Sequence, residues 1–81
     1  MRTKLRRILD LILDLNAQGA TKTTFSIAAH VNEIDIWVWE GEEFKEENTL
    51  YHERAYYAGQ LRDEAKVDEI IRSLEELRKD I

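Results

Sequence analysis

The chain has 81 residues, of which 43% are hydrophobic and 36% are charged, with a formal net charge of -5 and no cysteine. This balance predicts one folded domain spanning residues 1–81, and it argues against a disordered chain, a disulfide scaffold, a thiolate metal site and broad binding to phosphate backbones. Apolar runs are too short for a membrane span or a secretory leader, so we expect a cytoplasmic protein.

The first predicted element is an amphipathic helix from Arg2 to about Gln18. Its apolar stripe follows the spacing of three and four residues and comprises Leu5, Ile8, Leu9, Ile12 and Leu15, widened by Leu11 and Leu13. Gly19 is well placed to end it in the left-handed conformation. The helix opens with a basic cluster of Arg2, Lys4, Arg6 and Arg7. These charges oppose the helix dipole. They either bind phosphate or an acidic lipid surface, or form a solvated first turn that pairs with the acidic loop of the same or another molecule.

Two strands follow, from Thr21 to Val31 and from Ile34 to Trp39, because apolar residues there alternate with period two. Only Asn32 and Glu33 separate them, so we expect a tight hairpin. The partners on one face would be Val31 with Ile34, Ala29 with Ile36 and Ile27 with Val38. On the opposite face they would be His30 with Asp35, Ala28 with Trp37 and Ser26 with Trp39.

The second half of the chain is predicted as a connection, a strand and a helix. Glu40–Asn48 is polar and contains Gly41, which indicates an exposed connection. Aromatic enrichment over Thr49–Tyr57 favours a third strand, with a helix as the alternative. A second amphipathic helix is expected from Leu61 or Arg62 to Lys79.

This order of elements predicts an α+β fold in which both helices pack on one face of a three-stranded antiparallel sheet. The expected core is Leu5, Ile8, Leu9, Ile12, Leu15, Phe25, Ile27, Ala29, Val31, Ile34, Ile36, Val38, Val67, Ile70, Ile71, Leu74 and Leu77. Trp37 and Trp39 alternate with these strand residues, so they are expected on the uncovered face.

That uncovered face is the main candidate binding surface. Its predicted members are Trp37, Trp39, His30, Asp35, His52, Arg54 and Tyr56, an aromatic patch bordered by charge that is typical of protein interfaces. Aromatic sheet faces also stack single-stranded bases, but the acidic border disfavours that use.

An acidic loop beside this face is the second candidate surface. Its glutamates are Glu40, Glu42, Glu43, Glu46 and Glu47. They lack the spacing of a calcium loop, but their field would attract a basic partner.

The sequence contains few other candidate catalytic or ligand-binding residues. His30, Asp35 and His52 could form a metal or general-base site, although a cross-strand hydrogen bond is the simpler interpretation. The three glycines lie far apart, so no phosphate-binding loop is predicted. We therefore expect a protein without enzymatic activity, cofactor, metal or small-molecule substrate.

In size, element order and acidic middle, the chain resembles short accessory proteins of bacteriophages and prophages, some of which are anti-CRISPR proteins. The resemblance implies that the glutamates at 40, 42, 43, 46 and 47 stand in for phosphates before a groove lined by Lys and Arg. The leading hypothesis is a protein-binding module or inhibitor. The alternatives are a homodimeric structural protein without a separate ligand and a nucleic-acid-binding protein that uses Arg2, Lys4, Arg6, Arg7 and Arg54 with the tryptophans.

Overall fold

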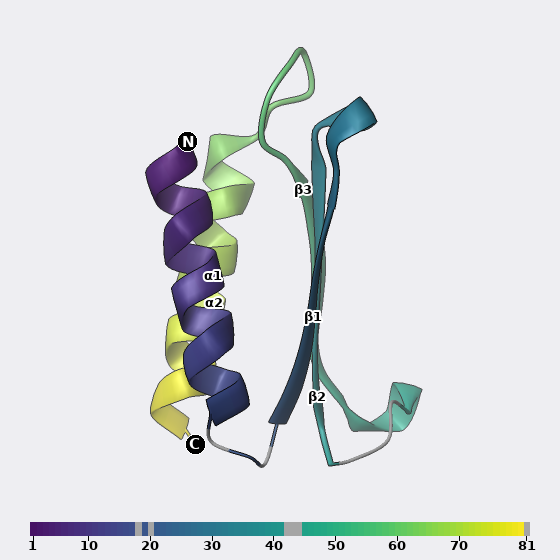
Figure 1. Cartoon of the computed structure of the whole chain (residues 1–81), viewed down its shortest axis with the longest axis vertical. Coiled ribbons are helices and arrows are strands. Elements are labelled where there is room, and N and C mark those ends of the chain that lie inside the picture. Colours follow the sequence, from purple (N-terminus) through teal and green to yellow (C-terminus); the bar gives the residue numbers. More distant parts are fainter. Residues whose placement is uncertain (18, 20, 42–44, 81) are drawn as a thin grey trace.

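Two helices cover one face of a three-stranded antiparallel sheet in the computed structural model, which describes residues 1–17, 19, 21–41 and 45–80 (Figure 1). The elements are α1 (Arg2–Ala17), β1 (Thr21–Ala28), η1 (Ala29–Val31), β2 (Glu33–Glu40), η2 (Glu46–Asn48), β3 (Thr49–Tyr56) and α2 (Glu64–Asp80), where η marks a short 3-10 helix. The strand order is β1-β2-β3, with β2 in the centre. The predicted α+β fold is confirmed, and the third segment is a strand rather than the alternative helix.

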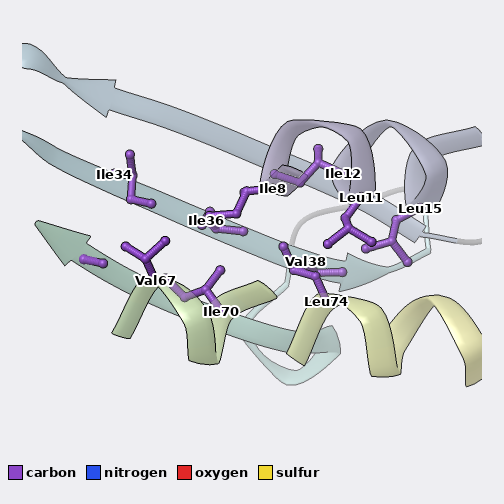
Figure 2. Packing of buried hydrophobic residues seen from close by; sticks show 11 residues of the cluster. Ile8, Leu11, Ile12, Leu15, Ile34, Ile36, Val38, Val67, Ile70 and Leu74 are labelled. Carbon is purple, nitrogen blue, oxygen red and sulfur yellow. The ribbon is translucent and has the colours of Figure 1, made fainter. Parts of the chain in front are cut away.

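The hydrophobic core fills the space between the helices and the sheet (Figure 2). Its buried members are Ile8, Leu11, Ile12, Leu15, Ile34, Ile36, Val38, Ala55, Val67, Ile70 and Leu74. Partly buried side chains pack around them, among them the predicted core residues Leu5, Phe25, Ile71 and Leu77. No helix among the described residues combines the length and apolar character that a membrane span requires.

Four residues that the sequence assigns to the core lie at its margin instead. Leu9, Ile27 and Val31 are 44%, 53% and 45% exposed, and Ala29 is also exposed. Leu9 lies on the flank of α1 opposite to α2, and Ile27 is on an edge strand. Val31 and Ala29 belong to η1, which extends from the end of the sheet. These core assignments were therefore wrong, because a helix or an edge strand buries only the part of its apolar stripe that meets a neighbour.

The hairpin between β1 and β2 also differs from the prediction. Four residues connect the strands, 29 to 32, and Asn32 closes the connection in the left-handed conformation at φ 57. A two-residue turn would require positive φ at Glu33 as well, which is unfavourable for glutamate. The longer connection shifts the pairing by four residues.

The observed partners are Ile27 with Ile34, Phe25 with Ile36 and Ser26 with Asp35. The predicted pairs of His30 with Asp35, Ala28 with Trp37 and Ser26 with Trp39 are consequently wrong. Trp37 lies opposite Thr24, and Trp39 lies opposite Lys22. Because the shift is an even number, every strand residue keeps its predicted face.

Ion pairs join α1 and α2, which run in the same direction (Figure 1). Lys4 Nζ lies 2.7 Å from Asp68 Oδ1, Arg7 Nη2 lies 3.1 Å from Glu75 Oε2, and Arg78 Nη1 lies 3.0 Å from Asp14 Oδ2. Lys4 and Arg7 of the basic cluster thus face the acidic side chains of the neighbouring helix. Their contacts offset the unfavourable alignment of two parallel helix dipoles.

A further ion pair fixes α2 to β3. Lys66 Nζ lies 2.8 Å from Glu53 Oε2 on the helix-covered face of the sheet. The Lys66 ammonium and the Arg54 backbone N–H both donate to the Glu53 carboxylate, and they hold its pKa below the usual range. Glu53 therefore stabilises the fold above its ordinary pKa, and this contribution is lost as the pH falls through the lowered value.

Replacing Glu53 by Gln should make the fold less sensitive to acid. Between about pH 6 and about pH 3, we expect the free energy of unfolding to fall less in Glu53→Gln than in the wild type, because the variant lacks the carboxylate at position 53, whose protonation destabilises the native state. Denaturant unfolding at each pH measures this difference. Glu69→Gln is the matched control, since Glu69 is 54% exposed and lies 3.8 Å from the same ammonium. Identical pH slopes for wild type and Glu53→Gln would contradict the assignment.

Candidate binding face of the sheet

The second face of the sheet carries most of the predicted binding residues. Ile34, Ile36 and Val38 of β2 are buried under the helices, so the alternating residues Asp35 and Trp37 point to the opposite side. Their cross-strand neighbours complete a surface that neither helix covers (Figure 1). We call this surface the open face and define it by Lys22, Thr24, Ser26, Glu33, Asp35, Trp37, Trp39, His52, Arg54 and Tyr56.

An ordered cluster forms the centre of the open face. The His52 ring stacks on Trp37 with 3.5 Å between ring centroids and 14° between planes. His52 Nε2 lies 2.9 Å from Asp35 Oδ1, within hydrogen-bond distance. Arg54 Nε lies 4.0 Å from the same carboxylate oxygen. The carboxylate therefore orients the imidazole, and the imidazole in turn orients the indole, so the aromatic rings are held in a fixed arrangement.

Side-chain exposure differs across the open face. Trp37, Trp39 and Tyr56 are partly buried, and the side chains of His52 and Asp35 are 29% and 31% exposed. Arg54 is the most accessible of the cluster, with 62% of its side chain exposed. Near Trp39 the pairing of β2 with β3 shifts register between Val38 and Trp39, and such irregularities bend a strand and redirect its side chains.

Acidic residues border one end of the open face. Glu40 is exposed at the end of β2, and Glu46 and Glu47 are exposed in η2. Figure 1 shows that η2 extends from the sheet on the side away from the helices, so Glu46 and Glu47 lie beside the open face. Glu40 instead pairs with Thr21 and alternates with Trp39, so it belongs to the helix-covered side of β2. Glu42 and Glu43, which the sequence places in the same cluster, lie outside the described residues. The acidic border is therefore formed by η2, and Glu40, which the sequence assigns to it, does not belong to it.

His30 does not join the central cluster. It lies exposed in η1 at the opposite end of the sheet, whereas Asp35 pairs with His52. The predicted site of His30, Asp35 and His52 is thus not assembled, because the hairpin connection carries His30 out of the strand. Within residues 1–17, 19, 21–41 and 45–80 there is neither a group of three potential metal ligands nor a pocket.

The basic cluster and the tryptophans lie on opposite sides of the sheet. α1 packs on the helix-covered face, where Lys4 and Arg7 form ion pairs with α2. Among the five basic residues predicted to contact nucleic acid, Arg54 alone lies on the open face. A surface that combines stacking bases on tryptophan with phosphate contacts from α1 is therefore not formed by one molecule.

Comparison of the chain with protein-family models, curated proteins and solved structures finds no significant match.

Three members of the open face were not predicted. Lys22 and Thr24 lie opposite the two tryptophans, and Glu33 pairs with Tyr56. Lys22 and Thr24 were missed because the assumed two-residue turn placed Ser26 and Ala28 opposite the tryptophans, and Glu33 was missed because it was assigned to the turn itself. Asn32 could have indicated the longer connection. A two-residue hairpin turn requires two neighbouring residues with positive φ, and only Asn32 favours that conformation here, which fits a connection with a single left-handed position.

Proposed function

We propose that the protein has no enzymatic activity and binds another protein through the open face. The observation that carries this proposal is the stack of Trp37 on His52, with His52 in turn held by Asp35. Tryptophan, tyrosine and arginine are the side chains most often found at energetic hot spots of interfaces. A surface whose rings are already oriented loses less conformational freedom on binding, so more of the contact energy appears as affinity.

The charges around the open face favour a basic partner. Glu33 and Asp35 lie on the face, and Glu46 and Glu47 border one end, against Lys22 and Arg54. Carboxylates arranged in this way attract Lys and Arg side chains and accelerate association at low ionic strength. In the phage accessory role that the sequence resemblance implies, these carboxylates would occupy a basic nucleic-acid channel of a host protein.

Truncation of Trp37 should weaken partner binding without unfolding the chain. Once a partner has been captured by the wild type and purified, we expect Trp37→Ala to raise its Kd by at least about tenfold, as for a hot-spot residue. Calorimetric titration measures the Kd, and circular dichroism tests the fold. Leu61→Ala is the matched control, because Leu61 is 66% exposed in the connection before α2 and lies off the open face.

Two outcomes would overturn the proposal. One is an unchanged Kd for Trp37→Ala together with native circular dichroism, which would place binding elsewhere. The other is a gel shift showing tight, strongly salt-dependent binding of single-stranded nucleic acid, because that would favour base stacking on the tryptophans.

A further inference from the structure

The two edges of the sheet differ in chemistry. β3 carries His52, Glu53 and Arg54 in sequence, and charged side chains of this kind discourage another strand from pairing. β1 has the sequence TKTTFSIA, in which Lys22 is the sole charged residue and proline is absent. β1 pairs with β2 on one side only. On its other side, Lys22 and the contact of Thr23 with Asn16 protect the start of the edge, whereas the residues from Thr24 to Ala28 carry no charge that would discourage strand addition.

Backbone groups on this edge point outward from the sheet. The Thr23 N–H donates to Asn16 Oδ1 of α1 over 3.0 Å, so it points away from β2. Amide groups alternate between the two sides of a strand, so those of Phe25 and Ile27 point the same way as that of Thr23. Asn16 occupies one outward donor near the start of β1, and the second half of the strand continues the edge.

An apolar strip runs along α1 above the same edge. Leu9 and Leu13, one helical turn apart, are 44% and 56% exposed. They lie on the flank of α1 opposite to Arg7, which contacts α2, because they are about 120° to 160° around the helix from it. Ile27 on β1 is 53% exposed on the helix-covered side of the sheet. Leu9, Leu13 and Ile27 therefore form a strip across both layers, which we call the edge strip.

We propose that two copies of this chain associate through antiparallel pairing of their β1 edges, with the edge strips packed against each other across a two-fold axis. Strand pairing joins two three-stranded sheets into one, and each copy covers the exposed leucines and isoleucine of the other.

The charges of α1 are complementary in this arrangement. Arg2 and Arg6 lie in its first half, whereas Asp10 lies in the second half and the last turn carries no basic residue; Asp14 is already paired with Arg78 of α2. A two-fold axis makes the two α1 helices antiparallel, so the basic half of each faces the acidic half of its partner. The two helix dipoles also become opposed, which is the favourable orientation.

The association would place both open faces on the same side of one continuous sheet. Two copies of the Trp37 and His52 stack would then be presented side by side, and a partner with two matching sites would gain avidity. The proposal itself rests on β1 and α1 and not on the open face, so it can fail or succeed independently of the proposed function.

Sedimentation equilibrium of the full chain, from micromolar to millimolar concentration, tests the proposal. We expect the mass to rise from that of one chain, 9.6 kDa, to that of two. Ile27→Lys and Leu13→Lys each place a positive charge at the two-fold interface, and each should raise the dissociation constant at least about tenfold. Both positions are exposed, so circular dichroism should remain native. Leu61→Lys, at an exposed position before α2, should behave as the wild type.

Amide hydrogen exchange supplies a readout at the edge itself. The amides of Phe25 and Ile27 should exchange more slowly as the protein concentration rises, because strand pairing protects them. A mass of one chain at every concentration would overturn the proposal. So would a dimer that is unaffected by both lysine variants but dissociated by Trp37→Ala, since that result would place self-association on the open face.

Discussion

Leu11→Ala is expected to lower the free energy of unfolding by about 2–5 kcal/mol, the usual cost of removing a buried leucine side chain. Leu11 is completely buried in α1, on the flank shared with Lys4 and Arg7, whose ion pairs reach α2. A domain of this length has a total stability of about 4–12 kcal/mol. The substitution should therefore remove a large fraction of the stability and leave part of the population unfolded at moderate temperature.

Leu9→Ala is the matched control for this experiment. It removes the same atoms from the same helix two positions away, but Leu9 is 44% exposed, so the expected loss is below about 1 kcal/mol. Urea unfolding at low micromolar concentration, which disfavours self-association, compares the two variants. Equal losses would contradict the observed orientation of α1 and would favour the sequence prediction, in which Leu9 belongs to the core.

This pair of leucines shows what helical periodicity predicts and what it leaves open. The spacing of apolar residues defined α1 to within one residue at its end, Ala17 against about Gln18. The stripe, however, spans Leu5 to Leu15 with seven apolar residues, and its width exceeds what one neighbour can cover. Which flank is buried depends on the position of α2, and α2 is distant in sequence. Local periodicity contains no information about that contact.

In the sheet, too, local periodicity predicts the face on which a residue lies but not the residue with which it pairs. Alternation assigned Trp37, Trp39, His52, Arg54 and Tyr56 to one side of the sheet, and the structure places them there. Register was a separate question, because it depends on the length of the hairpin connection and on the irregularity beside Trp39. Asp35 was therefore assigned to the correct face but to the wrong histidine.

The second large effect concerns a polar contact that the sequence did not reveal. Thr21 is 2% exposed, and its Oγ1 donates to the Leu15 carbonyl over 2.7 Å. Leu15 lies in the last turn of α1, where carbonyl groups have no partner within the helix. The hydroxyl satisfies one of these carbonyls and joins the end of α1 to the first residue of β1, across the turn that contains Gly19 at φ 79.

Thr21→Val should lower the free energy of unfolding by about 1–3 kcal/mol, because it leaves the buried Leu15 carbonyl without this donor while keeping the side-chain shape. Thr21→Ser is the control that retains the hydroxyl and loses only a methyl group, and it should cost less than the valine variant. Denaturant unfolding of the three proteins gives the comparison. If valine were as stable as threonine, the hydrogen bond would contribute nothing, and the position of β1 beneath α1 would have to depend on apolar packing alone.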